Sequence, residues 1–98
     1  MIKHIVFFKI KTQNKQEDLK ELKKMIDDLG TSIPSVINIE AGINFSPRES
    51  AFDLALFAEF NDEQGLKEYQ VHPQHVKLID HLGKLDKEIA VVDYMVQD

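Results

Sequence analysis

The chain has 98 residues, of which 43% are hydrophobic and 30% charged, so we expect one globular domain over residues 1–98 and exclude a disordered chain. A formal net charge of −5 disfavours nucleic acid as a partner, because binding to a phosphate backbone depends on lysines and arginines. Cysteine is absent, which excludes a disulfide framework and a thiolate nucleophile.

The first predicted element is a strand over residues 2–11, where β-branched and aromatic side chains alternate between two faces. One face carries Ile2, His4, Val6, Phe8 and Ile10. Ile5 and Phe7 lie on the other face, between lysines. The apolar run is too short for a signal-peptide core or a membrane span. We therefore predict a cytoplasmic protein with no membrane partner.

A helix is predicted next, over residues 15–29. Asn14 followed by Glu17 matches a capping box at its start. Gly30 predicts its end. The apolar residues that recur at helical spacing between these signals are Leu19, Leu22, Ile26 and Leu29.

Two further strands follow and are predicted to form a hairpin. The turn at Ile33-Pro34 leads into an alternating segment over residues 37–43. A loop over residues 46–50 separates it from a third strand over residues 52–60. In that third strand Leu54 and Leu56 share one face.

The second helix is predicted to begin at Asn61, because Asn61 and Gln64 repeat the capping pattern. It must break at Pro73, which has no amide donor and disfavours helical geometry in the preceding residue. The helix then restarts with Pro73 in its first turn, and His75, Ile79 and Leu82 share one of its faces.

A last strand is predicted over residues 87–96, which completes the order β-α-β-β-α-β. This is the ferredoxin-like arrangement of the α+β class, in which both helices pack on one face of an antiparallel sheet.

The predicted sheet is apolar on both faces, although its helices can cover only one. The outward positions include Ile5, Phe7, Ala55 and Phe57. A water-exposed surface of this kind would exceed what soluble monomers usually tolerate. We therefore predict an isologous homodimer in which two sheets meet through these residues. The alternative is a monomer with a modestly apolar outer face.

Several short motifs, in this order, make the chain resemble the stress-responsive dimeric α/β-barrel (Dabb) family. They are Ile2-Lys3-His4-Ile5-Val6, Ile33-Pro34, Glu40-x-Gly42-x-Asn44, Phe60-x-Asp62, Tyr69-x-x-His72-Pro73-x-His75 and Val92-Asp93-Tyr94. The resemblance implies a ferredoxin-like protomer and a sheet-to-sheet homodimer, in agreement with the periodicity. Family membership by itself implies no particular activity.

The candidate site consists of His75, Tyr69 and His4, which converge if the two halves of the second helix fold over the first strand. An apolar cleft with a few convergent polar groups is the usual form of a ligand site. The expected pocket walls are Val6, Phe8, Leu22, Ile26, Leu54, Leu56 and Ile79.

The family includes a plant polyketide cyclase, which this sequence resembles at the same positions. The resemblance implies that His75 is a general base, that Tyr69 binds the oxygen on which negative charge develops, and that His4 assists orientation. Such chemistry requires no metal and no organic cofactor. The aliphatic Leu22 and Ile26 replace aromatic residues of the cyclase, so the same substrate is not implied.

Other interpretations remain open at this point. Within the fold, an oxygen-dependent monooxygenase is the second enzymatic alternative. A non-catalytic binder of small apolar ligands and a structural stress-associated dimer are the others, with His72 capping the restarted helix and Tyr69 and His75 packed in the core. A metal site on His72 and His75 is disfavoured, because no carboxylate is placed beside them. His81 is predicted to lie on the surface.

Overall fold

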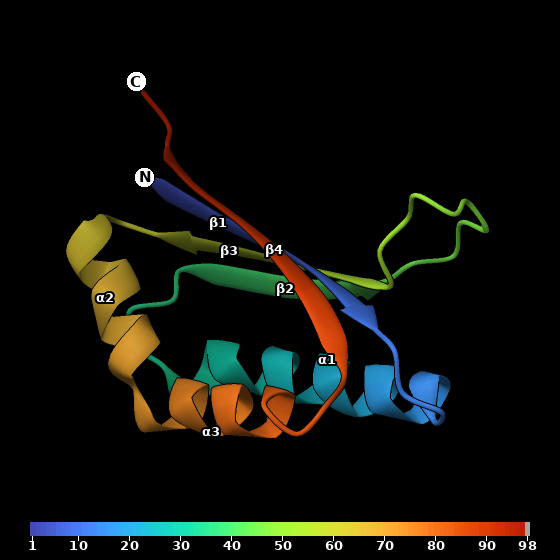
Figure 1. Ribbon diagram of the computed structural model, residues 1–98. Helices are drawn as coiled ribbons and strands as arrows, with labels where there is room; N and C mark the ends of the chain where they lie inside the picture. Colours follow the sequence, from blue (N-terminus) through green and yellow to red (C-terminus); the bar gives the residue numbers. More distant parts are fainter. Residues whose placement is uncertain (98) are drawn as a thin grey trace.

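The computed structural model describes residues 1–97 and shows an antiparallel sheet whose helices all lie on one face (Figure 1). The chain order confirms the ferredoxin-like α+β fold. The elements are β1 (Ile2–Ile10), α1 (Lys15–Ser32), β2 (Asn38–Ile43), β3 (Leu54–Phe60), α2 (Glu63–Val71), α3 (Pro73–Leu82) and β4 (Lys87–Met95).

The strand order in the sheet is β2-β3-β1-β4, so β1 is a central strand and β4 is an edge strand. Val6 of β1 pairs with Leu56 of β3 on one side and with Val91 of β4 on the other. His4, two residues earlier, lies opposite Ala58 and Asp93. Because side chains alternate along a strand, all of these residues point toward the helix layer.

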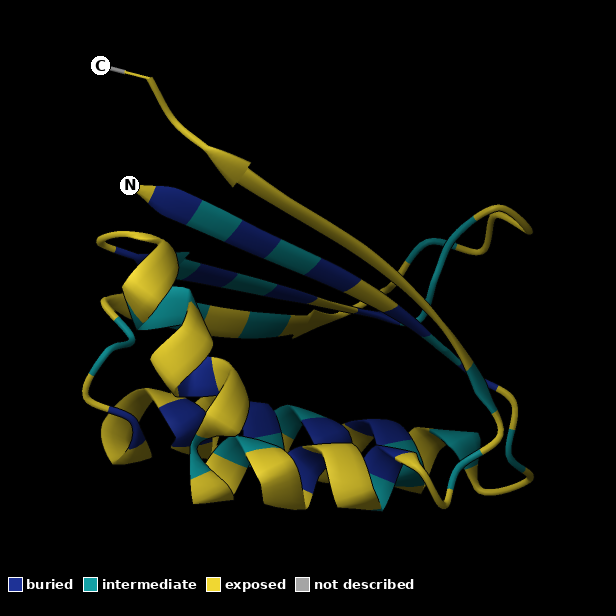
Figure 2. Cartoon of the chain, turned by 60° about the vertical axis from the view of Figure 1, so that its left-hand side comes forward, coloured by how far each residue is buried: buried dark blue, intermediate teal, exposed yellow. Residues whose placement is uncertain are grey.

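The core lies between the sheet and the helices. Alternate residues of β1 and β3 are buried, which gives both strands the banded pattern in Figure 2. From α1, the four leucines and isoleucines predicted from helical spacing are all buried. They are Leu19, Leu22, Ile26 and Leu29, with exposed fractions of 0–3%. Full burial of one such side chain stabilises a fold by about 1.5–3 kcal/mol.

The helix starts differ from both capping predictions. The Asn14 side chain makes no capping hydrogen bond, and the Thr12 hydroxyl donates to the Asp18 carboxylate at this end instead. At α2 the cap is Asp62 rather than Asn61, since its Oδ1 accepts from the backbone N of Gly65 at 2.9 Å. Asn and Asp are both good caps, and the extended backbone of the Phe60–Asp62 turn places the second one correctly.

The prediction that Gly30 ends α1 is wrong, because the helix continues to Ser32. A Cβ at position 30 would lie 2.7 Å from Cγ2 of Ile39, so the missing side chain lets α1 approach β2 closely. The next residue, Ile33, is no longer helical, and its extended backbone is the geometry favoured before a proline. Pro34 is therefore the stop signal, and Gly30 is a packing residue.

The helix break at Pro73 is confirmed. His72 is extended and lies between α2 and α3, and its Nδ1 accepts a hydrogen bond from the backbone N of Gln74 at 3.1 Å. Pro73 occupies the first turn of α3, where an amide donor is not needed. The break turns α3 away from the direction of α2, so the two helices cover different parts of the sheet (Figure 1).

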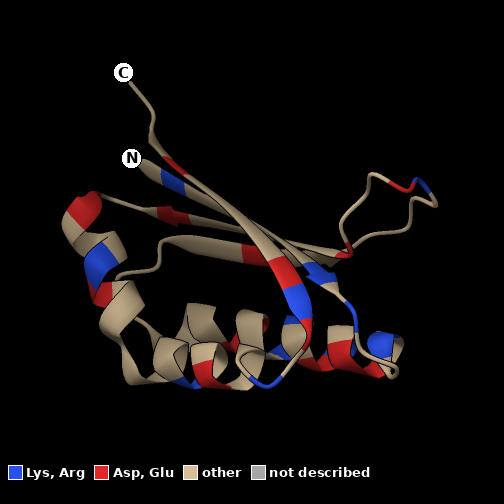
Figure 3. Cartoon of the chain, in the orientation of Figure 1, with Lys and Arg blue, Asp and Glu red and all other residues tan. Residues whose placement is uncertain are grey.

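The outer face of the sheet carries an apolar centre between charged residues. Phe7 is 43% exposed, Ala55 is exposed, and Ile5 and Phe57 are half-buried. At one end the Lys3 ammonium pairs with Glu59 and lies 5.4 Å from the centre of the Phe57 ring. On the helix-covered face, acidic and basic residues are intermixed along α1 (Figure 3).

β4 is the least covered strand. It packs against β1, and the helices lie mainly over the other strands, so β4 is exposed along its length (Figure 2). Ile89 and Val91 face the helix layer and are still 42% and 53% exposed. Within residues 1–97, no helix is both long enough and apolar enough to cross a bilayer.

Replacement of Gly30 tests its packing role. Alanine at an exposed helix position normally stabilises a helix by about 1 kcal/mol relative to glycine. We expect Gly30→Ala to lower the free energy of unfolding instead, because the new methyl group meets the stiff side chain of Ile39. In an Ile39→Ala background, which removes Cγ2, the same change is expected to be neutral or stabilising. Urea unfolding of the four proteins measures the coupling, and simple additivity would contradict this interpretation.

Candidate functional site

A cleft of about 210 Å³ lies between α3 and the inner face of β1 and β4. Its walls are mostly aliphatic, and its polar groups are gathered at the end where α2 meets α3. The residues that line it are His4, Val6, Phe8, Leu56, Tyr69, Gln70, His75, Leu78, Ile79, Leu82, Ile89, Val91 and Asp93. This combination of apolar walls and convergent polar groups is typical of small-molecule sites.

His75 is held by the helix break. It sits in the first turn of α3, and its Nδ1 lies 3.0 Å from the carbonyl oxygen of Gln70, in the last turn of α2. A carbonyl can only accept, so Nδ1 carries the proton and Nε2 of the neutral ring keeps its lone pair. Burial is the main cause that lowers the pKa of His75; the hydrogen bond to the Gln70 carbonyl acts in the opposite direction, and the neighbouring His4 adds to the lowering. His75 is thus a neutral base at neutral pH.

Tyr69 lies beside His75, with ring centres 4.4 Å apart, and only 1% of the residue is exposed. Phe60 packs on the other side of the Tyr69 ring at 5.0 Å. Burial raises the pKa of the Tyr69 phenol, so the hydroxyl stays protonated and can donate to an oxygen atom in the cleft.

His4 is anchored by Asp93. The two residues are opposite each other in the β1–β4 register, and Nδ1 of His4 is hydrogen-bonded to the Asp93 carboxylate. The His4 ring meets the Tyr69 ring edge-on, with ring centres 5.8 Å apart. Because a carboxylate only accepts, the bond assigns the proton to Nδ1 and orients the ring. His4, Tyr69 and His75 therefore form one cluster at the head of the cleft.

Comparison with known proteins identifies the family. The sequence matches the family described as "Stress responsive A/B Barrel Domain" (Dabb) over residues 2–96, which is almost the whole chain. The chain belongs to the Dabb family. No curated protein matches it significantly.

Solved structures similar to this Dabb domain share its fold over nearly the whole chain. A dimeric ferredoxin-like protein of unknown function from Bacteroides fragilis is 31% identical, with a TM-score of 0.86 and coverage of 97% of this chain and 95% of that one. An Arabidopsis thaliana protein is 25% identical, with a TM-score of 0.83 and coverage of 100% and 97%. A hydroxynitrile lyase from Passiflora edulis is 19% identical, with a TM-score of 0.84 and coverage of 99% and 94%, which shows the fold alone.

The pocket walls of the Dabb domain differ in part from those expected. Val6, Phe8, Leu56 and Ile79 line the cleft. Leu22, Ile26 and Leu54 do not line it, but are buried in the core with exposed fractions of 0–1%. Leu22 and Ile26 lie elsewhere because α1 packs mainly against β2 and α3, whereas the cleft lies between α3 and β4. Leu54 is on β3, where it pairs with Ile43 of the distant edge strand β2.

Sequence reasoning missed several residues of the cleft. Asp93 and Gln70 were assigned no role, and the aliphatic residues Leu78, Ile89 and Val91 were not expected in its walls. Asp93 had a recognisable signal, since it is an acidic residue between the apolar inward residues Val91 and Met95 of β4. The role of Gln70 left no signal in the sequence, because the group that contacts His75 is its backbone carbonyl.

Two other predictions about histidines can be compared with the structure. His81 is half-buried rather than on the surface, and its Nε2 is buried without a hydrogen-bond partner among residues 1–97. Nδ1 of His72 accepts a hydrogen bond from the backbone N of Gln74, whereas Nδ1 of His75 donates one to the carbonyl oxygen of Gln70. Among residues 1–97, no group of three metal-ligating side chains comes together.

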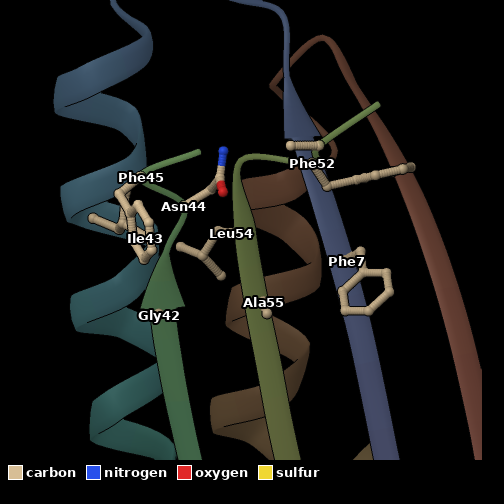
Figure 4. A pocket seen from close by; sticks show the side chains of 9 residues that line it. Phe7, Gly42, Ile43, Asn44, Phe45, Phe52, Leu54 and Ala55 are labelled. Carbon is tan, nitrogen blue, oxygen red and sulfur yellow. The ribbon is translucent and has the colours of Figure 1, made fainter. Parts of the chain in front are cut away.

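A second hollow, of about 410 Å³, lies on the opposite face of the sheet beside the β2–β3 loop. Figure 4 shows Phe7, Phe45 and Phe52 around it. Phe45 is 99% exposed. This hollow is larger than the cleft, but its lining contains no side chain that titrates or acts as a nucleophile. We therefore place the candidate chemistry in the smaller cleft.

The lowered pKa of His75 predicts a pH dependence of stability. In the unfolded chain its pKa is expected near 6.5, and burial lowers it in the folded protein. Above pH 6.5 both states are neutral and the fold has its full stability. As the pH falls through the folded pKa, the unfolded chain holds more protons, so the free energy of unfolding must decrease.

We expect His75→Asn to weaken this dependence, because asparagine keeps a donor near Gln70 but does not titrate. Urea unfolding of both proteins at pH 7.5 and at mildly acidic pH gives the slope of the free energy of unfolding against pH for each. Identical slopes in the parent and the variant would contradict the assignment, and circular dichroism at each pH serves as the control for folding.

Proposed function

We propose that this Dabb domain is a homodimer that binds a small carbonyl or aromatic compound in the cleft of each subunit and removes a proton next to a carbonyl group. The observation that carries the proposal is the pairing of His75 and Tyr69. One group is a neutral base with its Nε2 lone pair available, and the other is a protonated donor held 4.4 Å away, ring centre to ring centre.

The proposed step needs these two groups only. Nε2 of His75 takes the proton from the carbon atom, and the electron pair of the C–H bond moves to the carbonyl oxygen as an enolate. The Tyr69 hydroxyl donates a hydrogen bond to that oxygen, where the negative charge develops. The product of the step is an imidazolium ion and a hydrogen-bonded enolate, which can then attack a second carbonyl or be protonated elsewhere.

His4 orients the site from the other side of Tyr69. Its ring is fixed by Asp93 and packs against the phenol, so we assign the pair a positioning role. The same positions carry the resemblance to olivetolic acid cyclase, a cofactor-independent polyketide cyclase. The hydroxynitrile lyase of Passiflora edulis has the same fold, so a lyase site can be built on it.

The size of the cleft favours a small ligand. About 210 Å³ is less than the roughly 300–1,000 Å³ typical of pockets for drug-sized molecules. The aliphatic walls also support a second candidate, a non-catalytic binder in which Tyr69 and His75 hold the oxygen of an apolar ligand. A base at His75 would also serve a monooxygenase that deprotonates its substrate, but no contact among the described residues of the cleft points to oxygen chemistry in particular. A cytoplasmic location and independence from cofactors stay predictions.

The homodimer is supported by the outer face of the sheet. Ile5, Phe7, Ala55 and Phe57 form the apolar centre of this face, and charged residues flank it. The protein from Bacteroides fragilis, which is 31% identical, is described as dimeric. Two such faces related by a two-fold axis would cover each other, as an isologous interface requires.

Proton abstraction can be measured directly as deuterium exchange. With butanone, acetophenone and 4-hydroxyacetophenone in D₂O, we expect the protein to accelerate exchange next to the carbonyl of at least one compound. His75→Asn should reduce the accelerated rate by at least about 100-fold, and Tyr69→Phe by roughly 100-fold. The ¹H NMR signal of the exchanging protons reports the rate.

His72→Asn is the matched control, because it removes a neighbouring imidazole outside the cleft and leaves a good helix cap. Its rate should equal that of the parent. Equal exchange in all variants would remove both residues from the mechanism. Binding at the cleft with no exchange above the buffer rate would replace the enzyme by the non-catalytic binder.

A charge at the centre of the outer face should separate the subunits. We expect Phe7→Glu to sediment as an 11.3 kDa monomer where the parent sediments as a dimer, because the two-fold axis would bury two unpaired carboxylates. Val71→Glu changes an exposed apolar residue of α2, 75% exposed, and should leave the dimer intact. A parent that is monomeric at micromolar concentration would overturn the dimer.

A further inference from the structure

The helices α2 and α3 present faces of the same spacing to the uncovered strand β4. Each face uses positions i, i+3, i+4 and i+7, which lie in a row on a helix. On α3 these are His75, Leu78, Ile79 and Leu82, and all four line the cleft described above. On α2 they are Glu63, Leu66, Lys67 and Gln70, and all four line a further hollow of about 260 Å³.

The cleft and this further hollow meet at Gln70 and Asp93, which line both. On the strand side, the inward row of β4 continues from Val91 through Asp93 to Met95, which pairs with Ile2. Met95 is 48% exposed, so the strand remains uncovered here as well. The two hollows are therefore neighbouring parts of one groove between β4 and the two helices.

The two parts of the groove differ in chemistry. We call them the α3 lobe, which is the cleft, and the α2 lobe, which is the hollow lined by Leu66 and Met95. The α3 lobe is walled by aliphatic residues. The α2 lobe also carries Glu63 and Lys67, and within residues 1–97 no ion pair occupies the Lys67 ammonium. It thus offers both an acceptor and a donor, which suits a polar, uncharged group.

We propose that the two lobes form one elongated site for an amphipathic carbonyl compound. Its apolar tail lies in the α3 lobe, its carbonyl group lies at His75 and Tyr69, and a hydrogen-bonding end such as a hydroxyl or amide lies beside Lys67 in the α2 lobe. The position of the carbonyl rests on the proposed function, whereas the extent of the groove does not.

Two ligands of equal length test the proposal. N-(2-hydroxyethyl)-3-oxoheptanamide and N-propyl-3-oxoheptanamide differ only in a terminal hydroxyl or methyl group. We expect the hydroxyethyl compound to bind the parent about fivefold more tightly, as one additional hydrogen bond predicts. Both should shift the backbone amide NMR signals of Leu66 and Met95. The shorter octane-2,4-dione should shift only signals of the α3 lobe.

Lys67→Met removes the donor at an exposed position, so the variant is expected to fold. It should abolish the preference for the hydroxyethyl compound and leave the affinity for octane-2,4-dione within about twofold of the parent. Lys20→Met makes the same change at an exposed position of α1, away from the groove. It should alter neither the preference for the hydroxyethyl compound nor the affinity for octane-2,4-dione.

The preference for the hydroxyethyl compound, if retained in Lys67→Met, would overturn the proposal, as would signal shifts confined to the α3 lobe with both long compounds. These outcomes are separate from the proposed function. Shifts at Leu66 and Met95 with no deuterium exchange would leave the elongated site and remove the enzyme. Deuterium exchange that depends on His75, without NMR shifts in the α2 lobe, would leave the enzyme and remove the elongated site.

Discussion

The position of β4 at the edge of the sheet is the constraint on which the candidate site depends. β1 holds β4 by a continuous antiparallel ladder, and α1 lies on the helix-covered face over the other edge of the sheet, at β2. The inward side chains of β4, such as Val91, therefore face a groove rather than a packed helix. A sheet with more helices would bury this strand and close the cleft. Because all the helices lie on one face, they also leave the outer face of the sheet uncovered.

The helix break at Pro73 fixes the orientation of the candidate base, His75. Because a new helix starts after His72, the carbonyl of Gln70 has no backbone donor from a continuing helix. It accepts a hydrogen bond from Nδ1 of His75 instead. This bond selects the tautomer in which Nε2 is basic. The packing of Tyr69 between Phe60 and His75 then places a proton donor next to that base.

Prediction from the sequence succeeded where a signal was local or periodic. The helical spacing of α1, the alternation in β1 and the break at Pro73 all correspond to the structure. It failed where two signals of the same kind competed, as with Asn61 and Asp62, or where a residue had a second use, as with Gly30. The walls Leu22, Ile26 and Leu54 were misplaced because periodicity shows which side chains point inward, but not which part of the interior they reach.

By itself, the sequence determined the class of fold, the two apolar faces of the sheet and the residue types available for proton transfer. These follow from side-chain periodicity and from proline, whose effects extend over only a few residues. Only the tertiary structure decided that Asp93 meets His4, that the Gln70 carbonyl meets His75, and that the groove continues along α2. These contacts depend on strand register and helix direction, which are set by the packing of residues far apart in the chain.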